Sequence, residues 1–146
     1  MTEFTSEIKI LPYNDTEVFS VLSDLSNLEF VKDKIPQDKI KDFSFDKDSC
    51  TISVDPVGKI RFNIVERVAN NFVKFQAEQV PFGLDLIVEL NNNEENKTEL
   101  KLTVNANLNP FIKPMVSKPL QQGLEKMAET LAMLPYGEIA KMGTQE

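Results

Sequence analysis

Few side chains in this chain of 146 residues have the chemistry expected of an active site. There is no histidine, and Cys50 is the single cysteine. Without histidine, the usual general base near neutral pH and the commonest nitrogen ligand of zinc are both missing. Ser6 is the one hydroxyl that the strand pattern places inward, and no base lies near it in sequence. We therefore expect a protein without catalytic residues, without a metal site and without a cofactor.

The clustered charged residues have simpler explanations than catalysis. The carboxylates between Asp42 and Asp48 flank a turn and are expected to be solvated. A group of lysines precedes them, and it is expected to form a solvated face, with a docking patch as the alternative. These lysines are Lys32, Lys34, Lys39 and Lys41.

The overall charge limits the class of partner. The chain has 23 acidic and 16 basic residues and a net charge of −7, so neither nucleic acid nor an anionic membrane is expected as a main partner. No run approaches the ~20 apolar residues of a membrane span, and the N-terminus lacks the features of a signal peptide. Cys50 alternates with Ile52 and Val54, which favours a buried, reduced thiol and a cytoplasmic location.

The N-terminal region is predicted to form one strand and two short helices. Apolar residues recur at every second position at its start, which indicates a strand half-buried on one face. The inward positions of this strand would be Phe4, Ser6, Ile8 and Ile10. Asn14 can cap the first helix, and Glu17 completes a capping-box pattern. Ser26 can cap a second helix that Pro36 ends.

Six further strands are predicted between about Ile40 and Leu108. Short segments with alternating apolar residues are separated there by turn signals, such as the sequence from Asp55 to Gly58. Because the connections are short, neighbouring strands should be antiparallel, with one face of the sheet in solvent.

A final helix is predicted from Val116 to Leu134, because its apolar residues are spaced by threes and fours. Pro114 and Pro119 lie inside this pattern, so the start of the helix should be kinked or form a separate turn. Gly123 in its middle indicates close approach to a strand, with a hinge as the alternative. Residues 1–146 are expected to form one domain whose end, after about residue 140, is frayed.

This order of elements resembles the helix-grip fold of the START-like (SRPBCC) superfamily, which includes polyketide cyclase-like proteins and lipid-transfer domains. The resemblance covers residues 2 to about 136. It is carried by the stretch from Asn14 to Asn27, which resembles the first helix of the family, and by the Asn109-Pro110 entry to the last helix. It implies an α+β fold: a curved antiparallel sheet of about seven strands, two short helices after the first strand and a long C-terminal helix over the sheet.

The resemblance also implies a cavity between the sheet and the C-terminal helix that holds a hydrophobic molecule. An ordinary core without a cavity is the alternative. The expected ligand-binding residues are Phe62, Ile64, Phe75, Phe82, Leu84, Leu86, Leu102, Val104, Met115, Leu120, Leu124 and Met127. Phe111, Ile112 and Met115 would lie at the rim of its entrance.

We expect the protein to bind or carry a small hydrophobic ligand, such as a lipid, a quinone or a polyketide-like molecule, without transforming it. A protein-interaction module of the co-chaperone, ribosome-associated or respiratory-chain-associated kind is one alternative. It would have a filled core and an exposed apolar patch near Val65 and Ile87. A cyclase- or hydratase-type enzyme is the other alternative, and it requires an ionisable group facing the cavity.

Overall fold

The computed structural model describes residues 2–27, 41–54, 58–78, 83–94, 97–134 and 136–137. Eight strands and two helices lie within these ranges. In chain order they are β1 (Thr2–Thr5), β2 (Lys9–Leu11), α1 (Asp15–Leu22), β3 (Lys41–Phe45), β4 (Ser49–Val54), β5 (Gly58–Val68), β6 (Phe72–Glu78), β7 (Leu84–Glu94), β8 (Lys97–Ala106) and α2 (Lys113–Ala132). The second short helix predicted after Ser26 falls largely outside the described residues.

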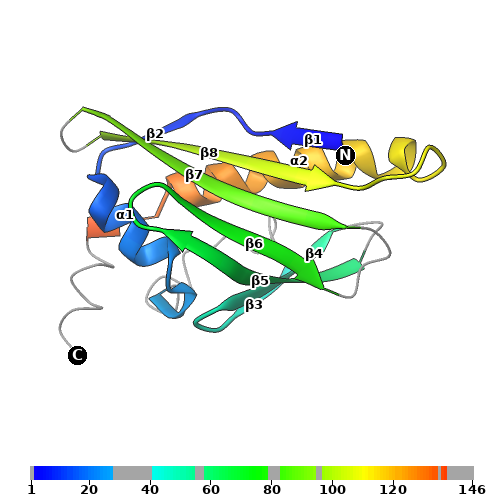
Figure 1. Ribbon diagram of the computed structural model, residues 1–146, viewed down its shortest axis with the longest axis horizontal. Helices are drawn as coiled ribbons and strands as arrows, with labels where there is room; N and C mark the ends of the chain where they lie inside the picture. The colour runs from blue at the N-terminus through cyan, green and yellow to red at the C-terminus, as the bar shows by residue number, and fades with distance from the viewer. Residues whose placement is uncertain are drawn as a thin grey trace.

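All strands belong to one antiparallel sheet. Its order is β1-β8-β7-β6-β5-β4-β3, and β2 also pairs with β8. Strands β3 to β8 therefore follow one another as a meander, and the N-terminal strands close the far edge. The long helix α2 runs across one face of this curved sheet, and α1 lies at one end (Figure 1). The predicted α+β helix-grip architecture is confirmed.

The core lies between α2 and the inner face of the sheet. On β7 and β8, alternate apolar residues face each other directly, with Leu86 opposite Val104 and Val88 opposite Leu102. These side chains are all buried. Because burying a side chain of this size stabilises the fold by roughly 1.5–3 kcal/mol, this inner face is a main source of stability.

Helix α1 begins as the sequence predicts. The Oδ1 atom of Asn14 accepts a hydrogen bond from the backbone N–H of Glu17 at 2.8 Å, which satisfies one of the free donors of the first turn. Val18, Val21 and Leu22 on its inner side are buried. The cap and the apolar stripe together place α1 against the end of β7 and β8.

The N-terminal strand differs from the prediction. It is broken into β1 and β2, and the side chains of Ile8 and Ile10 are 55% and 58% exposed. Thr5 pairs with Thr103 and Lys9 with Leu100, so the three residues 6–8 of this strand lie opposite the two residues 101 and 102 of β8. The extra residue reverses the inward face. Leu11, rather than Ile10, is therefore buried.

Helix α2 begins three residues before its predicted start at Val116, ends two residues before its predicted end at Leu134, and continues through Pro119 without interruption. Pro114 occupies the first turn, where a missing N–H costs nothing. Before the helix, the side-chain oxygen of Asn109 accepts hydrogen bonds from the N–H groups of Phe111 and Ile112. The separate first turn expected at the prolines is therefore wrong, and the turn lies before Lys113.

Tyr136, which follows α2, is fully buried. Its hydroxyl donates a hydrogen bond to the carbonyl oxygen of Leu131 at 2.5 Å, and its ring meets the edge of the Tyr13 ring with centroids 5.7 Å apart. This contact holds the segment after α2 against the start of α1.

Candidate ligand-binding hollow between α2 and the sheet

The inner face of the sheet and α2 enclose a small hollow. The hollow is partly open to solvent, and its cavity volume is about 40 Å³. The side chains around it come from β5, β7, β8 and α2. They are Ile60, Phe62, Leu84, Leu86, Val104, Leu120, Leu124 and Met127, and Gly123 contributes its backbone.

The spacing of these residues explains how they meet. On the sheet, the wall residues occupy alternate positions of their strands, so they share the inner face. On α2, the positions of Leu120, Gly123, Leu124 and Met127 differ by three, four and seven residues, so they share one side of the helix.

Gly123 does not have the role expected from the sequence. A Cβ atom added at this position would meet nothing within 4 Å apart from its neighbours in the helix. Close approach of the helix to a strand is therefore not the reason for this glycine. The absence of a side chain at this position leaves open space. It also lowers stability, because a glycine in a helix interior costs about 1 kcal/mol relative to alanine.

Seven of the twelve expected ligand-binding residues line the hollow: Phe62, Leu84, Leu86, Val104, Leu120, Leu124 and Met127. Ile60 and Gly123 join them and were missed. Ile60 is the inward residue next to Phe62 on the same strand, so the alternation of β5 contained the signal for it. The role of these residues in binding remains a prediction.

The other expected residues lie elsewhere. Phe75 and Leu102 are buried in the core beyond the hollow, and Ile64 is partly buried against that core. Met115 is 63% exposed, because α2 begins before it and turns its side chain away from the sheet. Phe82 lies outside the described residues. Of the expected rim, Phe111 is exposed as well, and it does not line the hollow.

The described walls of the hollow are apolar and include no ionisable side chain. Water needs two to four polar partners to occupy a buried site stably, and apolar cavities stay dry. The hollow is therefore suited to a hydrocarbon group. At about 24 cal/mol per Å³, an empty space of about 40 Å³ costs about 1 kcal/mol, which the fold can tolerate.

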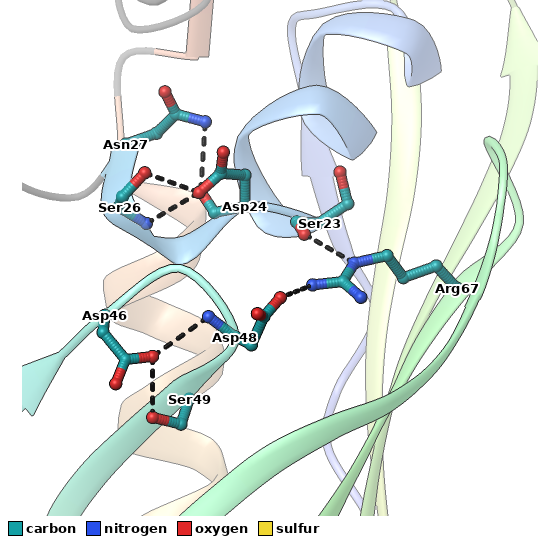
Figure 2. A network of polar contacts seen from close by, with 8 residues as sticks. All are labelled: Ser23, Asp24, Ser26, Asn27, Asp46, Asp48, Ser49 and Arg67. Atoms are coloured by element: carbon teal, nitrogen blue, oxygen red, sulfur yellow. Dashed lines mark hydrogen bonds and ion pairs between the residues drawn. The ribbon is translucent and has the colours of Figure 1, made fainter.

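Asp46 and Asp48 of the β3–β4 turn lie in a polar network (Figure 2), and neither residue lines the hollow. Hydrogen bonds from the Ser49 hydroxyl and the Asp48 N–H hold the pKa of Asp46 below its ordinary value. Arg67 donates to Asp48 and to the carbonyl oxygen of Ser23. These contacts join the turn to the end of α1, so the acidic cluster has a structural explanation.

Cys50 is buried beside the hollow's strands, at a position directly opposite Phe62. Burial, with a smaller contribution from the charge of Asp46, raises the pKa of its thiol to about 12. A thiol of this kind is almost fully protonated at neutral pH and is a poor nucleophile. It therefore behaves as the small buried hydrophobe that the sequence indicates.

Of the other surface features expected from the sequence, the apolar pair Val65 and Ile87 lies within the described residues. Val65 is half exposed and Ile87 is partly buried, and single apolar residues of this kind are common on protein surfaces. The side chains of the lysine group near Lys32 lie outside the described residues.

In the described ranges, no three acidic, cysteine or histidine residues are arranged to hold a metal ion. Within the same ranges, neither helix is long and apolar enough to span a bilayer.

No protein-family model matches the chain, and no curated protein matches it. Solved structures do resemble it. A START superfamily protein from Mycobacterium smegmatis aligns with a TM-score of 0.63 at 14% identity, covering 96% of this chain and 98% of that chain. Norcoclaurine synthase from Thalictrum flavum, solved with dopamine and hydroxybenzaldehyde, aligns with a TM-score of 0.68 at 11% identity, covering 99% and 87%.

A third similar structure is the Aha1 dimer from Colwellia psychrerythraea, with a TM-score of 0.57 at 16% identity, covering 91% of this chain and 98% of that chain. Identities this low establish the fold and leave the function open. The chain has the START-like helix-grip fold that the sequence resemblance implied.

Proposed function

We propose that this protein binds a small hydrophobic molecule in the hollow between α2 and the sheet and does not transform it. The observation that supports this most directly is the set of purely apolar walls around a space that Gly123 leaves open. The single cysteine, which can form no disulfide within the chain, fits a role in a reducing cytoplasm. Norcoclaurine synthase, which has the same fold, was solved with two small molecules bound.

The size of the hollow defines what part of a ligand it can hold. A volume of about 40 Å³ has room for roughly three water-sized groups, whereas ligand pockets usually measure about 300–1,000 Å³. Only part of a ligand therefore fits without movement of the walls. Met127 is partly buried and has an unbranched, adaptable side chain, so it is the wall residue that can yield most easily. At about 0.8 kcal/mol for each buried CH₂, three groups would contribute about 2 kcal/mol.

Native mass spectrometry of the freshly purified protein tests this function, followed by denaturation and extraction into organic solvent. A stoichiometric adduct that is lost on denaturation and recovered as an apolar molecule is the expected result. A bare mass, together with no thermal shift from fatty acids, quinones or aromatic polyketides, would overturn the proposal.

Two variants on the same helix locate the bound molecule. Gly123→Leu places an apolar side chain in the hollow and should abolish the adduct, and Gly123→Ala should weaken it. Gln122→Leu adds a similar side chain at the exposed neighbouring position and should leave the adduct unchanged. If Gly123→Leu folds and retains the adduct, the ligand lies elsewhere.

The enzyme alternative receives less support, because the described wall of the hollow includes no group that could act as an acid or base. Tyr136 is the buried tyrosine, and its hydroxyl is used by the carbonyl oxygen of Leu131 rather than directed into the hollow.

A further inference from the structure

Gly123 is the exception in the side of α2 that faces the sheet. Along this side, Leu120, Leu124 and Met127 each direct an apolar side chain toward the sheet. A residue of the same kind at position 123 would continue the stripe and occupy the open space. The absence of a side chain at position 123 therefore adds open space to the hollow at this point of the helix.

Two common structural reasons for a glycine, a left-handed backbone and a close neighbouring atom, do not apply at position 123. Its backbone lies within a regular helix from Lys113 to Ala132, so a left-handed conformation is not needed. A Cβ atom would meet nothing within 4 Å, so no neighbouring atom excludes a side chain. Alanine would favour the helix more. A binding partner that occupies the space beside Gly123 would explain a residue that the fold itself does not require.

We infer that the backbone of Gly123 receives the bare hydrocarbon end of an elongated ligand, of the acyl-chain or isoprenoid-chain class. This inference rests on the proposed function and specifies its ligand. The volume of about 40 Å³ accommodates a chain end of a few carbon atoms and excludes a bulky ring system in the present shape.

The chemistry of the walls separates a hydrocarbon end from a polar one. Leu86, Val104 and Leu124 line the same hollow as Gly123, and their side chains offer no hydrogen-bond partner. A hydroxyl group at the buried end of the chain would lose its hydrogen bonds to water without replacement. Any polar group of the ligand must therefore remain toward the mouth, and hydroxylation of the far end should weaken binding strongly.

Titration calorimetry with two probes tests this arrangement on the whole chain, after removal of any copurified ligand. Laurate and 12-hydroxylaurate have the same carboxylate and the same chain length, and they differ only at the far end. The wild-type protein is expected to bind laurate at least tenfold more tightly. Gly123→Ala should weaken both probes while keeping this preference. Gly123→Ser, which adds one hydroxyl at the same place, should reduce the preference to about threefold or less.

The outcomes distinguish this inference from the proposed function. Equal binding of the two probes to the wild-type protein, or an unchanged preference in folded Gly123→Ser, would overturn the role of Gly123 and leave a hydrophobic-ligand site in place. An adduct in native mass spectrometry without laurate binding would overturn the chain class alone. The absence of both an adduct and laurate binding would overturn the proposed function as well. Thermal unfolding of each variant shows whether it is folded.

Discussion

The hydroxyl oxygen of Ser6 accepts a hydrogen bond from the backbone N–H of Leu102 at 2.9 Å, while the N–H of Ser6 donates to the carbonyl oxygen of Leu102. Between β1 and β2 the edge strand contains one extra residue, so the regular backbone pairing with β8 is interrupted. The Ser6 hydroxyl there takes the place of a backbone carbonyl as the acceptor for the N–H of Leu102. It also donates to the carbonyl oxygen of Glu7. Ser6 therefore stabilises the irregularity that turns Ile8 outward and Leu11 inward.

Replacing Ser6 with alanine should destabilise the fold by about 1–3 kcal/mol, because the buried N–H of Leu102 would lose its acceptor. Equilibrium unfolding in urea measures the change. Ser20→Ala provides the control, because that hydroxyl is exposed and bonds only within α1; its effect should stay within about 0.5 kcal/mol. Equal stability of the two variants would contradict the role of Ser6.

The same region shows why part of the fold could not be predicted from the sequence. The alternation from Phe4 to Ile10 is regular, and nothing local marks the extra residue, because the register is decided by pairing with β8 far along the chain. The burial of Tyr136 could not be predicted either, because the ring that it contacts, Tyr13, is distant in sequence. By contrast, Asn14 and the stripe of α2 act locally, and both predictions are confirmed. For the hollow, the alternation identified most of the wall, but it could not show that Gly123 faces open space.

Loss of the N-terminal cap of α1 should lower the free energy of unfolding moderately. Asn14→Ala removes the acceptor for the Glu17 N–H and should cost about 1 kcal/mol of stability. Asn14→Asp retains an acceptor at the same position and should preserve most of the stability. Denaturant midpoints of the two variants measured together would decide this, and a loss shared by both would show that the amide group has another role.

The contact of Arg67 with Asp48 should contribute little to stability, although it is prominent in the network of Figure 2. Both side chains are at least a third exposed, and such pairs are typically worth about 0.2–1 kcal/mol. A double-mutant cycle with Arg67→Ala and Asp48→Ala should give a coupling energy in this range. A coupling above about 2 kcal/mol would show that the turn and α1 are joined more tightly than the exposure of these groups indicates.

Gly123→Ala should stabilise the ligand-free protein by about 0.5–1 kcal/mol, because alanine favours the helix and meets no neighbouring atom. Gly137→Ala is the contrasting variant. There, a Cβ atom would lie 3.2 Å from an oxygen of Glu17 and 3.4 Å from the ring of Tyr13, so no gain is expected. Thermal and urea unfolding of both variants test this. A loss of stability in Gly123→Ala would show that the space beside it is needed by the fold.

The free energy of unfolding should decrease at alkaline pH, and Cys50 is one cause of this decrease. Burial raises the pKa of its thiol from the ordinary value of 9.0 to about 12 in the folded state. Between these two values the unfolded chain releases this proton and the folded chain retains it, so the unfolded state binds fewer protons and the free energy of unfolding decreases as pH rises. The decrease has an upper limit of about 1.4 kcal/mol per pH unit. Tyr136, whose pKa burial also raises, adds a further loss at higher pH.

The variant Cys50→Ala isolates the contribution of the thiol, because it leaves Tyr136 unchanged. Its unfolding free energy should start lower at pH 8, owing to lost packing, and should then decline less steeply than that of the wild-type protein from pH 9 to 11. A thiol-specific disulfide reagent at pH 8 should react with the folded wild-type protein at least 100-fold more slowly than with the unfolded chain, since the thiolate is scarce and buried. Parallel pH profiles of the two proteins, or rapid labelling of the folded chain, would mean that position 50 is open to solvent and that the inner side of β4 is not sealed.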